Sequence, residues 1–404
     1  LLSRGLGDVY KRQFDNQWEA TRRIITSAQA DIKPFGDERL VITPQAYWHR
    51  DVDHYQLTRG KEGAKNGENY HRTDVYGASL NAHATWLLGK TAVGMDIRKE
   101  HILSTAYGDL LPENEWKDIH GTDRRYDHRG DRTNTSLFLE HNVILGGFTL
   151  SAGVLANRNT GLDGDFRFYP GVDLSYRPNE MWKFYASWNK ALRVPTYTDL
   201  YTSNSVQQGD TGLRPERTST FKAGTRFRTR GVEAVVSGFY SKGNDIIDWV
   251  YETEESRKYH AMNIGKLDNM GYSVDATLNM TELLPGSFVT RIKAGYARIH
   301  QRHTTEQPVY RSLYALEYLR HKATFQLDHR IWSRLSASWA VRWQERMNHY
   351  EPYTKVDCKL QWTAPTYSLY VKADNITNHR YYDLGGVRQP GLWIMAGGSV
   401  KIGL

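Results

Sequence analysis

The sequence predicts an all-β protein, a transmembrane antiparallel up-and-down β-barrel, of which this chain supplies about 17 strands. Three observations carry the prediction: apolar and polar residues alternate, short and long connections alternate, and a hydrophilic chain is rich in aromatic residues. Of 404 residues, 26 are Tyr, 12 are Trp and 12 are Phe, although only 39% of the chain is hydrophobic. Tyr and Trp favour boundaries between water and an apolar phase.

The alternation has a period of two over long stretches. Leu335, Trp339 and Trp343 share one face of such a stretch, while the residues between the apolar positions are mostly polar. Residues 272–280 and 394–404 follow the same pattern. This pattern is typical of strands with one apolar and one polar face. No run approaches the ~18 apolar residues of a membrane-spanning helix, which excludes a helical membrane protein.

Turn signals divide the strands in a regular rhythm. Short connections are expected near residues 36, 89, 146, 178, 230, 285, 333 and 365. Longer polar segments lie between them, at 58–69, 108–124, 194–213, 251–257, 302–308 and 376–390. The rhythm predicts that the tight turns lie at one end of the sheet and the long loops at the other.

Two architectures use many alternating strands, and they differ in what covers the apolar face. A soluble β-solenoid or propeller needs a repeat of 20–50 residues, which the sequence lacks. In an outer-membrane barrel, strands of ~10 residues cross the bilayer and the apolar face meets lipid. The barrel therefore predicts that Trp339, Leu360 and Val400 face outward, while Lys222 and Asp357 face a polar lumen.

Residues 1–13 do not alternate, lack the apolar core of a signal peptide and contain no initiating Met. We expect them to be a non-native or disordered leader, followed by one barrel domain over residues 14–404. Counting strands back from a periplasmic end at Leu404 gives a first strand that runs the wrong way for a periplasmic N-terminus. Further strands are therefore expected upstream.

Charge and chemistry exclude several functions. Lys and Arg number 53 and Asp and Glu 45, a net charge of +8, but the basic residues are interleaved rather than clustered, so no nucleic-acid partner is expected. Cys358 is the only cysteine, which excludes an internal disulfide, and we interpret it as a small apolar filler. No catalytic motif is present, and the acidic loop at 163–165 lacks the ligand spacing of a calcium site. We expect neither an enzyme nor a cofactor.

Two segments carry a family resemblance. Residues 191–201 and then 212–218 resemble the paired barrel motif of TonB-dependent outer-membrane receptors, through Arg193, Pro195, Leu213, Arg214, Pro215 and Glu216. Residues 373–383, followed by 389–393, resemble the family's penultimate strand, last loop and last strand. The last strand carries the C-terminal signature Trp393, Ile402 and Leu404, in which Leu404 replaces the usual Phe. Leu192 and Val194 replace the usual Phe and Ala of the first motif.

The resemblance implies a barrel of 22 strands around an N-terminal plug, of which this chain holds about 17 strands and no plug. It implies a monomeric active-transport receptor in the outer membrane of a Gram-negative bacterium, surrounded by lipopolysaccharide and outer-membrane lipid. TonB would energise import of a scarce bulky nutrient such as a ferric siderophore or cobalamin. Haem is disfavoured because residues 196–212 contain no His. The alternative is a passive general porin of 16–18 strands.

The resemblance leaves two interpretations open for the residues at the loop end. Arg193 and Arg214 with Glu216 either tie down one extracellular loop or contact the ligand. Tyr197 and Tyr201 either offer a stacking surface to a ligand or belong to the aromatic girdle at the rim.

Overall fold

The computed structural model describes residues 17–162, 164–305, 307–316, 318–347, 350–383 and 387–401. The expected leader and the signature residues Ile402 and Leu404 lie outside these ranges. The main sheet has 18 strands, one of which is the two-residue β5 (Asp109–Leu110). The others are β1 (Trp18–Gln29), β2 (Leu40–Gln56), β3 (Glu68–Trp86), β4 (Gly89–Ser104), β8 (His128–Leu145), β9 (Phe148–Asn159), β10 (Arg167–Tyr176), β11 (Trp182–Arg193), β13 (Glu216–Thr229), β14 (Val232–Asn244), β17 (Lys266–Asn279), β18 (Val289–Thr304), β20 (Leu319–Arg330), β21 (Leu335–Arg346), β22 (Tyr353–Thr363), β23 (Tyr367–Asp374) and β26 (Trp393–Val400).

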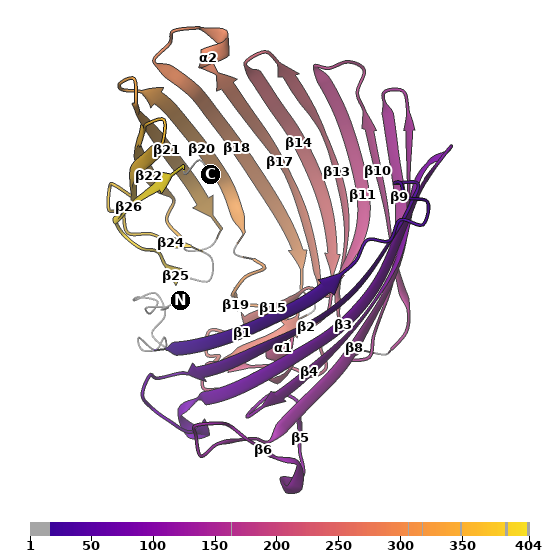
Figure 1. Ribbon diagram of the computed structural model, residues 1–404. Helices are drawn as coiled ribbons and strands as arrows, with labels where there is room; N and C mark the ends of the chain where they lie inside the picture. Colours follow the sequence, from indigo (N-terminus) through magenta and orange to yellow (C-terminus); the bar gives the residue numbers. More distant parts are fainter. Residues whose placement is uncertain are drawn as a thin grey trace.

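Each long strand pairs antiparallel with the next one along the chain, from β1 to β26. Figure 1 shows that the sheet curls into most of a cylinder, with β1 and β26 both on its open side. Within the described ranges no pairing joins β1 to β26, so the wall has two free edges. The predicted partial up-and-down barrel of about 17 strands is confirmed.

The predicted placement of the tight turns at one end of the sheet is also confirmed, but the alternation of short and long connections is not strict. The eight predicted turns join β1–β2, β3–β4, β8–β9, β10–β11, β13–β14, β17–β18, β20–β21 and β22–β23, and the other connections lie at the opposite end of the strands. Two loop-end connections, 160–166 and 347–352, were not among the predicted long segments because they are short. No helix among the described residues is long and apolar enough to cross a membrane.

The loops carry small elements of their own. They are η1 (Ala64–Asn66), η2 (Glu113–Glu115), β6 (Lys117–Asp118), β7 (Arg125–Tyr126), α1 (Tyr197–Tyr201), β12 (Gln207–Gln208), β15 (Ile247–Tyr251), β16 (Tyr259–Asn263), β19 (Arg311–Ser312), β24 (Tyr382–Asp383) and β25 (Val387–Arg388). At the turn end, α2 (Met280–Leu283) lies between β17 and β18.

The apolar face of the wall is uncovered, as predicted. Trp339 is 37% exposed, Leu360 42% and Val400 71%, and no second layer of the described chain packs on them. Register places Trp339 opposite Cys358, so the cysteine shares this face with Leu360. Helix α1 lies on the opposite, concave side, where the ring of Tyr197 packs so closely on Gly130 that a Cβ there would lie 2.7 Å from it. The apolar face is therefore the outer one.

The inner face carries a recurrent pairing of an aromatic ring with a glycine. In five places an aromatic residue lies directly opposite a glycine of the neighbouring strand, and its ring covers the glycine. The pairs are Tyr47–Gly77, Phe138–Gly94, Tyr185–Gly224, Phe239–Gly271 and Tyr370–Gly397. Because glycine has no Cβ, the ring can pack directly on the neighbouring backbone, and it shields a position that would otherwise weaken the strand.

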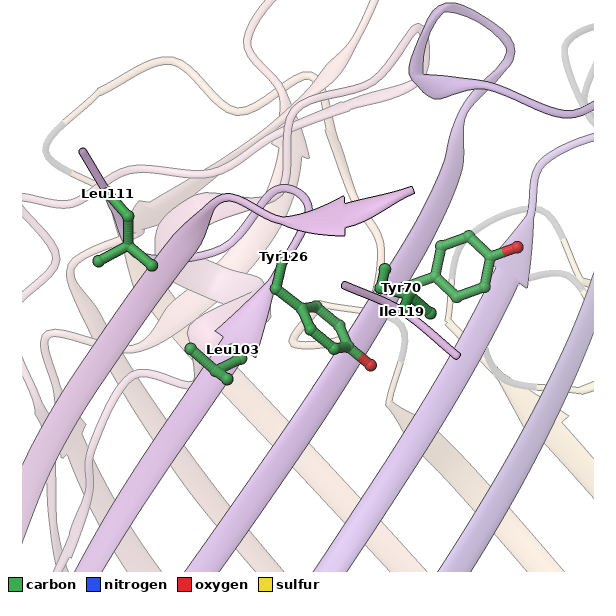
Figure 2. Close-up of a cluster of buried hydrophobic side chains, with 5 residues drawn as sticks. All are labelled: Tyr70, Leu103, Leu111, Ile119 and Tyr126. Carbon is green, nitrogen blue, oxygen red and sulfur yellow. The ribbon is translucent and has the colours of Figure 1, made fainter. Parts of the chain in front are cut away.

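The connection between β4 and β8 folds back onto the outer face of the wall. Figure 2 shows Leu111, Ile119 and Tyr126 of this loop packed on Tyr70 and Leu103 of the strands, all five buried. Burying one such side chain contributes about 1.5–3 kcal/mol. The loop is therefore held against the outside of the wall and not over the lumen.

Candidate functional site

Arg193 connects four elements at the loop end of the wall. It is the last residue of β11 and lies opposite Glu216, the first residue of β13. Its guanidinium donates to Glu216 at 2.7 Å, to Asp199 of α1 at 3.2 Å and to the carbonyl of Ile247 in β15 at 3.1 Å. Glu216 also accepts the Ile247 N–H at 2.8 Å. One guanidinium and one carboxylate thus join β11, α1, β13 and β15, the geometry expected if these residues tie down the loop.

Helix α1 forms at this place because its first turn is capped from both sides. The Thr196 hydroxyl accepts the Asp199 N–H at 3.0 Å, and the Asp199 carboxylate accepts the Thr196 N–H at 3.0 Å, which is a capping box. Pro195, fully buried, precedes the cap and cannot continue a strand ladder. Its carbonyl accepts a hydrogen bond from Arg132 of β8 at 2.9 Å, which fixes the helix to the inner wall.

Tyr197 and Tyr201 lie on the lumen side of the wall and not in the outer aromatic belt. Their ring centroids are 6.2 Å apart, and the Arg132 guanidinium lies 4.6 Å from the centroid of the Tyr197 ring. Burial raises the pKa of Tyr197, so its phenol is neutral at physiological pH. The pair presents aromatic surface beside a cation, an arrangement suited to stacking, and ligand contact stays a prediction for both residues.

Arg214 does not join Glu216, although both belong to the same sequence motif. It donates from Nε to Asp245 at 2.9 Å, and Arg217 donates to the other carboxylate oxygen at 2.6 Å. Burial alone acts to raise the pKa of Asp245, but the hydrogen bonds from Arg217 and Arg214 outweigh it and lower that pKa. The Asn263 side-chain carbonyl accepts the Arg214 backbone N–H at 2.9 Å, and its amide nitrogen donates to the Asp245 backbone carbonyl at 2.7 Å. The motif therefore supplies two separate ion pairs.

A buried carboxylate that the sequence analysis missed joins two further loops. Asp248 of β15 is 1% exposed and accepts hydrogen bonds from the Ser312 hydroxyl and from the N–H groups of Ala315 at 2.9 Å and Tyr314 at 3.2 Å. Burial raises the pKa of Asp248. Its signal in the sequence is an acidic residue inside the apolar run 246–250.

The apolar residues around Asp248 form the core of the loop layer. Leu213 of the motif packs with Ile247, Trp249, Tyr259 and Ala261, each buried. Pro215 is buried as well, so two of the motif residues serve packing.

A cavity of about 780 Å³ lies between the α1 loop and the inner face of β1–β4. Its lining includes Tyr197 together with two aspartates, two glutamates and two arginines, which are Asp51, Asp53, Glu19, Glu100, Arg23 and Arg132. Such a mixed polar surface suits a hydrated ligand with several hydrogen-bonding groups. Within the part of the chain that the structure describes, no three His, Cys, Asp or Glu side chains come together as a metal site.

Of the C-terminal signature, the described residue is Trp393. It is 55% exposed at the start of β26, opposite Asp374 of β23. It lies at the loop end of the wall, and the register places it on the inner face with Gly397, whereas its neighbour Ile394 faces outward.

Comparison with protein families gives one match over most of the chain. The model described as "TonB dependent receptor-like, beta-barrel" matches residues 3–376. The match includes both halves of the Arg193–Glu216 motif and no plug domain.

Several solved structures share the fold. The copper transporter OprC superposes with a TM-score of 0.71 at 16% identity, over 94% of this chain and 65% of that one. The FrpB iron transporter from Neisseria meningitidis (F3-3 variant) gives 0.69 at 17%, over 94% and 63%. The ferric citrate transporter FecA in its unliganded form gives 0.70 at 16%, over 95% and 62%. The chain thus spans somewhat less than two thirds of the length of these proteins.

Proposed function

The chain belongs to the TonB-dependent receptor β-barrel family, and from this premise we propose that it forms the channel wall of a receptor importing a scarce, bulky nutrient. The family consists of outer-membrane transport proteins of Gram-negative bacteria and not of enzymes. The observation that carries the proposal is the family match over residues 3–376, which covers the whole curved wall up to the end of β23.

A ferric siderophore or cobalamin is the proposed class of ligand. The cavity beside α1 has the polar lining and the volume of a site for part of such a molecule. Tyr197 and Tyr201 would supply stacking surface, and Arg132 would supply a cation for an anionic group. The copper, iron and ferric citrate transporters that share the fold support a metal-bearing cargo.

The other partners follow from the same proposal. TonB would deliver energy from the inner membrane, and the receptor would act as a monomer. Arg193, Glu216 and Asp199 would hold the α1 loop in place while the ligand enters. Trp393, Ile402 and Leu404 would belong to the strand that the outer-membrane assembly machinery reads.

Uptake measurements test this function against a passive porin, which the family match disfavours. The receptor that contains this barrel is expressed in a Gram-negative strain lacking its own siderophore and cobalamin receptors, with and without a functional tonB gene. We expect uptake of radiolabelled ferric siderophore or cobalamin to require both the receptor and TonB. Uptake that persists without TonB would favour the porin, and uptake of neither compound would overturn the ligand class.

A further inference from the structure

We propose that the outer face of β11, β13, β14 and β17 holds a binding site for a phosphorylated glycolipid of the outer leaflet. The four strands are neighbours in the wall (Figure 1), and the site lies where their apolar belt meets the loops. A cavity of about 720 Å³ opens there, lined by Arg167, Lys190, Arg217 and Lys266. It is separate from the lumenal cavity beside α1.

Register defines the apolar floor of the site. Trp188 lies opposite Phe221, Phe221 opposite Tyr240, and Tyr240 opposite Met270. Phe221 is 50% exposed, and Tyr240 and Met270 are also exposed on the lipid-facing side. This row of three aromatic residues and a methionine is typical of the level at which acyl chains give way to headgroups.

Cations follow directly above the aromatic row. One pleat nearer the loops, Lys190 and Lys242 both lie opposite Ser219, on either side of β13. One pleat further, Arg217 lies opposite Asn244, and Lys266 begins β17. The amine of Lys190 lies 5.9 Å from the centroid of the Trp188 ring, so it reaches down to the aromatic row. Lysine and arginine at this depth attract anionic headgroups at about 1 kcal/mol each.

The lysines of this patch lack the kind of acidic partner that two arginines of β2 and β3 possess. On the outer face of β2–β4, Arg50 and Arg72 both pair with Asp74. Among the described residues, by contrast, no carboxylate lies within salt-bridge distance of Lys190, Lys242 or Lys266.

In the described part of the chain two carboxylates belong to the patch, and both accept hydrogen bonds from other residues. Asp245 lines the cavity and accepts from Arg214 and Arg217. Asp268 lies opposite Lys242 and accepts the Tyr240 hydroxyl at 3.1 Å. The patch therefore keeps a positive charge above an apolar floor, which fits a ligand with phosphate groups on an acylated sugar and not a neutral lipid.

Binding of diphosphoryl lipid A to the detergent-solubilised protein, followed by native mass spectrometry, tests the site. The variant Lys190→Gln/Lys266→Gln removes two cations of the patch. Its matched control, Lys183→Gln/Lys222→Gln, removes two cations from the inner face of the same wall. At about fivefold per charge, we expect the first variant to bind roughly 30-fold more weakly and the control to bind like the wild type.

Two further probes identify the source of the phosphate. Lipid A stripped of its phosphates is expected to bind as weakly as diphosphoryl lipid A binds to the patch variant, and inorganic phosphate is not expected to compete. Three outcomes would each overturn the proposal. They are equal binding of the stripped lipid, competition by inorganic phosphate at equal affinity, and unchanged binding of diphosphoryl lipid A by the patch variant. The readout involves neither TonB nor a nutrient, so it is independent of the uptake measurements.

Discussion

The ring of Tyr370 lies on Gly397, and from this contact we predict that Gly397→Ala destabilises the wild type but stabilises a variant that lacks the ring. In Gly397→Ala the new Cβ would lie 2.7 Å from both Cζ and Oη of Tyr370. Ordinary carbon contacts are about 3.5–4.0 Å, so the ring must move by roughly 1 Å. The Lys359 amine also lies 4.8 Å from the ring centroid, which restricts that movement. Overpacking of this kind costs about 1–3 kcal/mol, whereas alanine in a strand is otherwise better than glycine by about 0.5–1 kcal/mol.

The two terms separate in a double-mutant cycle. We expect Gly397→Ala to lower the free energy of unfolding by about 0.5–2 kcal/mol in the wild type and to raise it by about 0.5–1 kcal/mol in Tyr370→Ala. Urea unfolding in lipid vesicles, followed by tryptophan fluorescence, measures both. Gly238→Ala is the control, since a Cβ there would lie 3.6 Å from its nearest neighbour. The same destabilisation in both backgrounds would refute the role assigned to the ring.

Three further predictions concern the loop layer and the two faces. Arg193→Ala removes three hydrogen bonds of a side chain that is 43% exposed, so we expect the local stability of the α1 loop to fall by about 1–2 kcal/mol. Amide hydrogen exchange in 196–202 should become roughly 5–30-fold faster, with exchange in the main sheet unchanged. Unaltered exchange in 196–202 would contradict the role of Arg193 in holding this loop. Burial raises the pKa of Asp248 above its ordinary 3.8, so we expect docking of 311–316 to be strongest below pH 3.8 and to weaken as the pH rises through the elevated pKa. Amide hydrogen exchange in this segment, corrected for intrinsic rates, should show this trend. The substitution Asp248→Asn should abolish it. Val274→Arg, on the lipid face at mid-strand, should cost about 2–4 kcal/mol in vesicle unfolding, whereas Ser273→Arg on the inner face should cost far less; equal costs would refute the assignment of faces.

The strands and their faces were predictable because their signal is local. Every strand has one face toward lipid and one toward the lumen. The alternation around Trp339 or Val274 therefore shows which residues of that strand face outward, whichever strands lie beside it. The turns were equally local. The loop-end connections 160–166 and 347–352 escaped because short polar segments resemble turns.

The contacts between elements were not predictable. The ring of Tyr370 covers Gly397 because of the register between β23 and β26, which no pattern within one strand defines. Asp248 binds a loop 64 residues away, through Ser312, and its partners are mostly backbone N–H groups that any residue provides. The motif residue Arg214 was expected beside Glu216, but the position of Asp245 at a backbone φ of 55° gives it a different partner.

The loop between β4 and β8 that lies on the outside of the wall offers an experimental handle. Its tip, residues 120–123, is exposed, while Ile119 and Tyr126 on either side are anchored. The native thiol of Cys358 faces lipid at the far side of the sheet, away from aqueous reagents. A fluorophore attached through a cysteine introduced at Asp123 would therefore allow single molecules to be localised on living cells, and it would not block the entrance to the lumen.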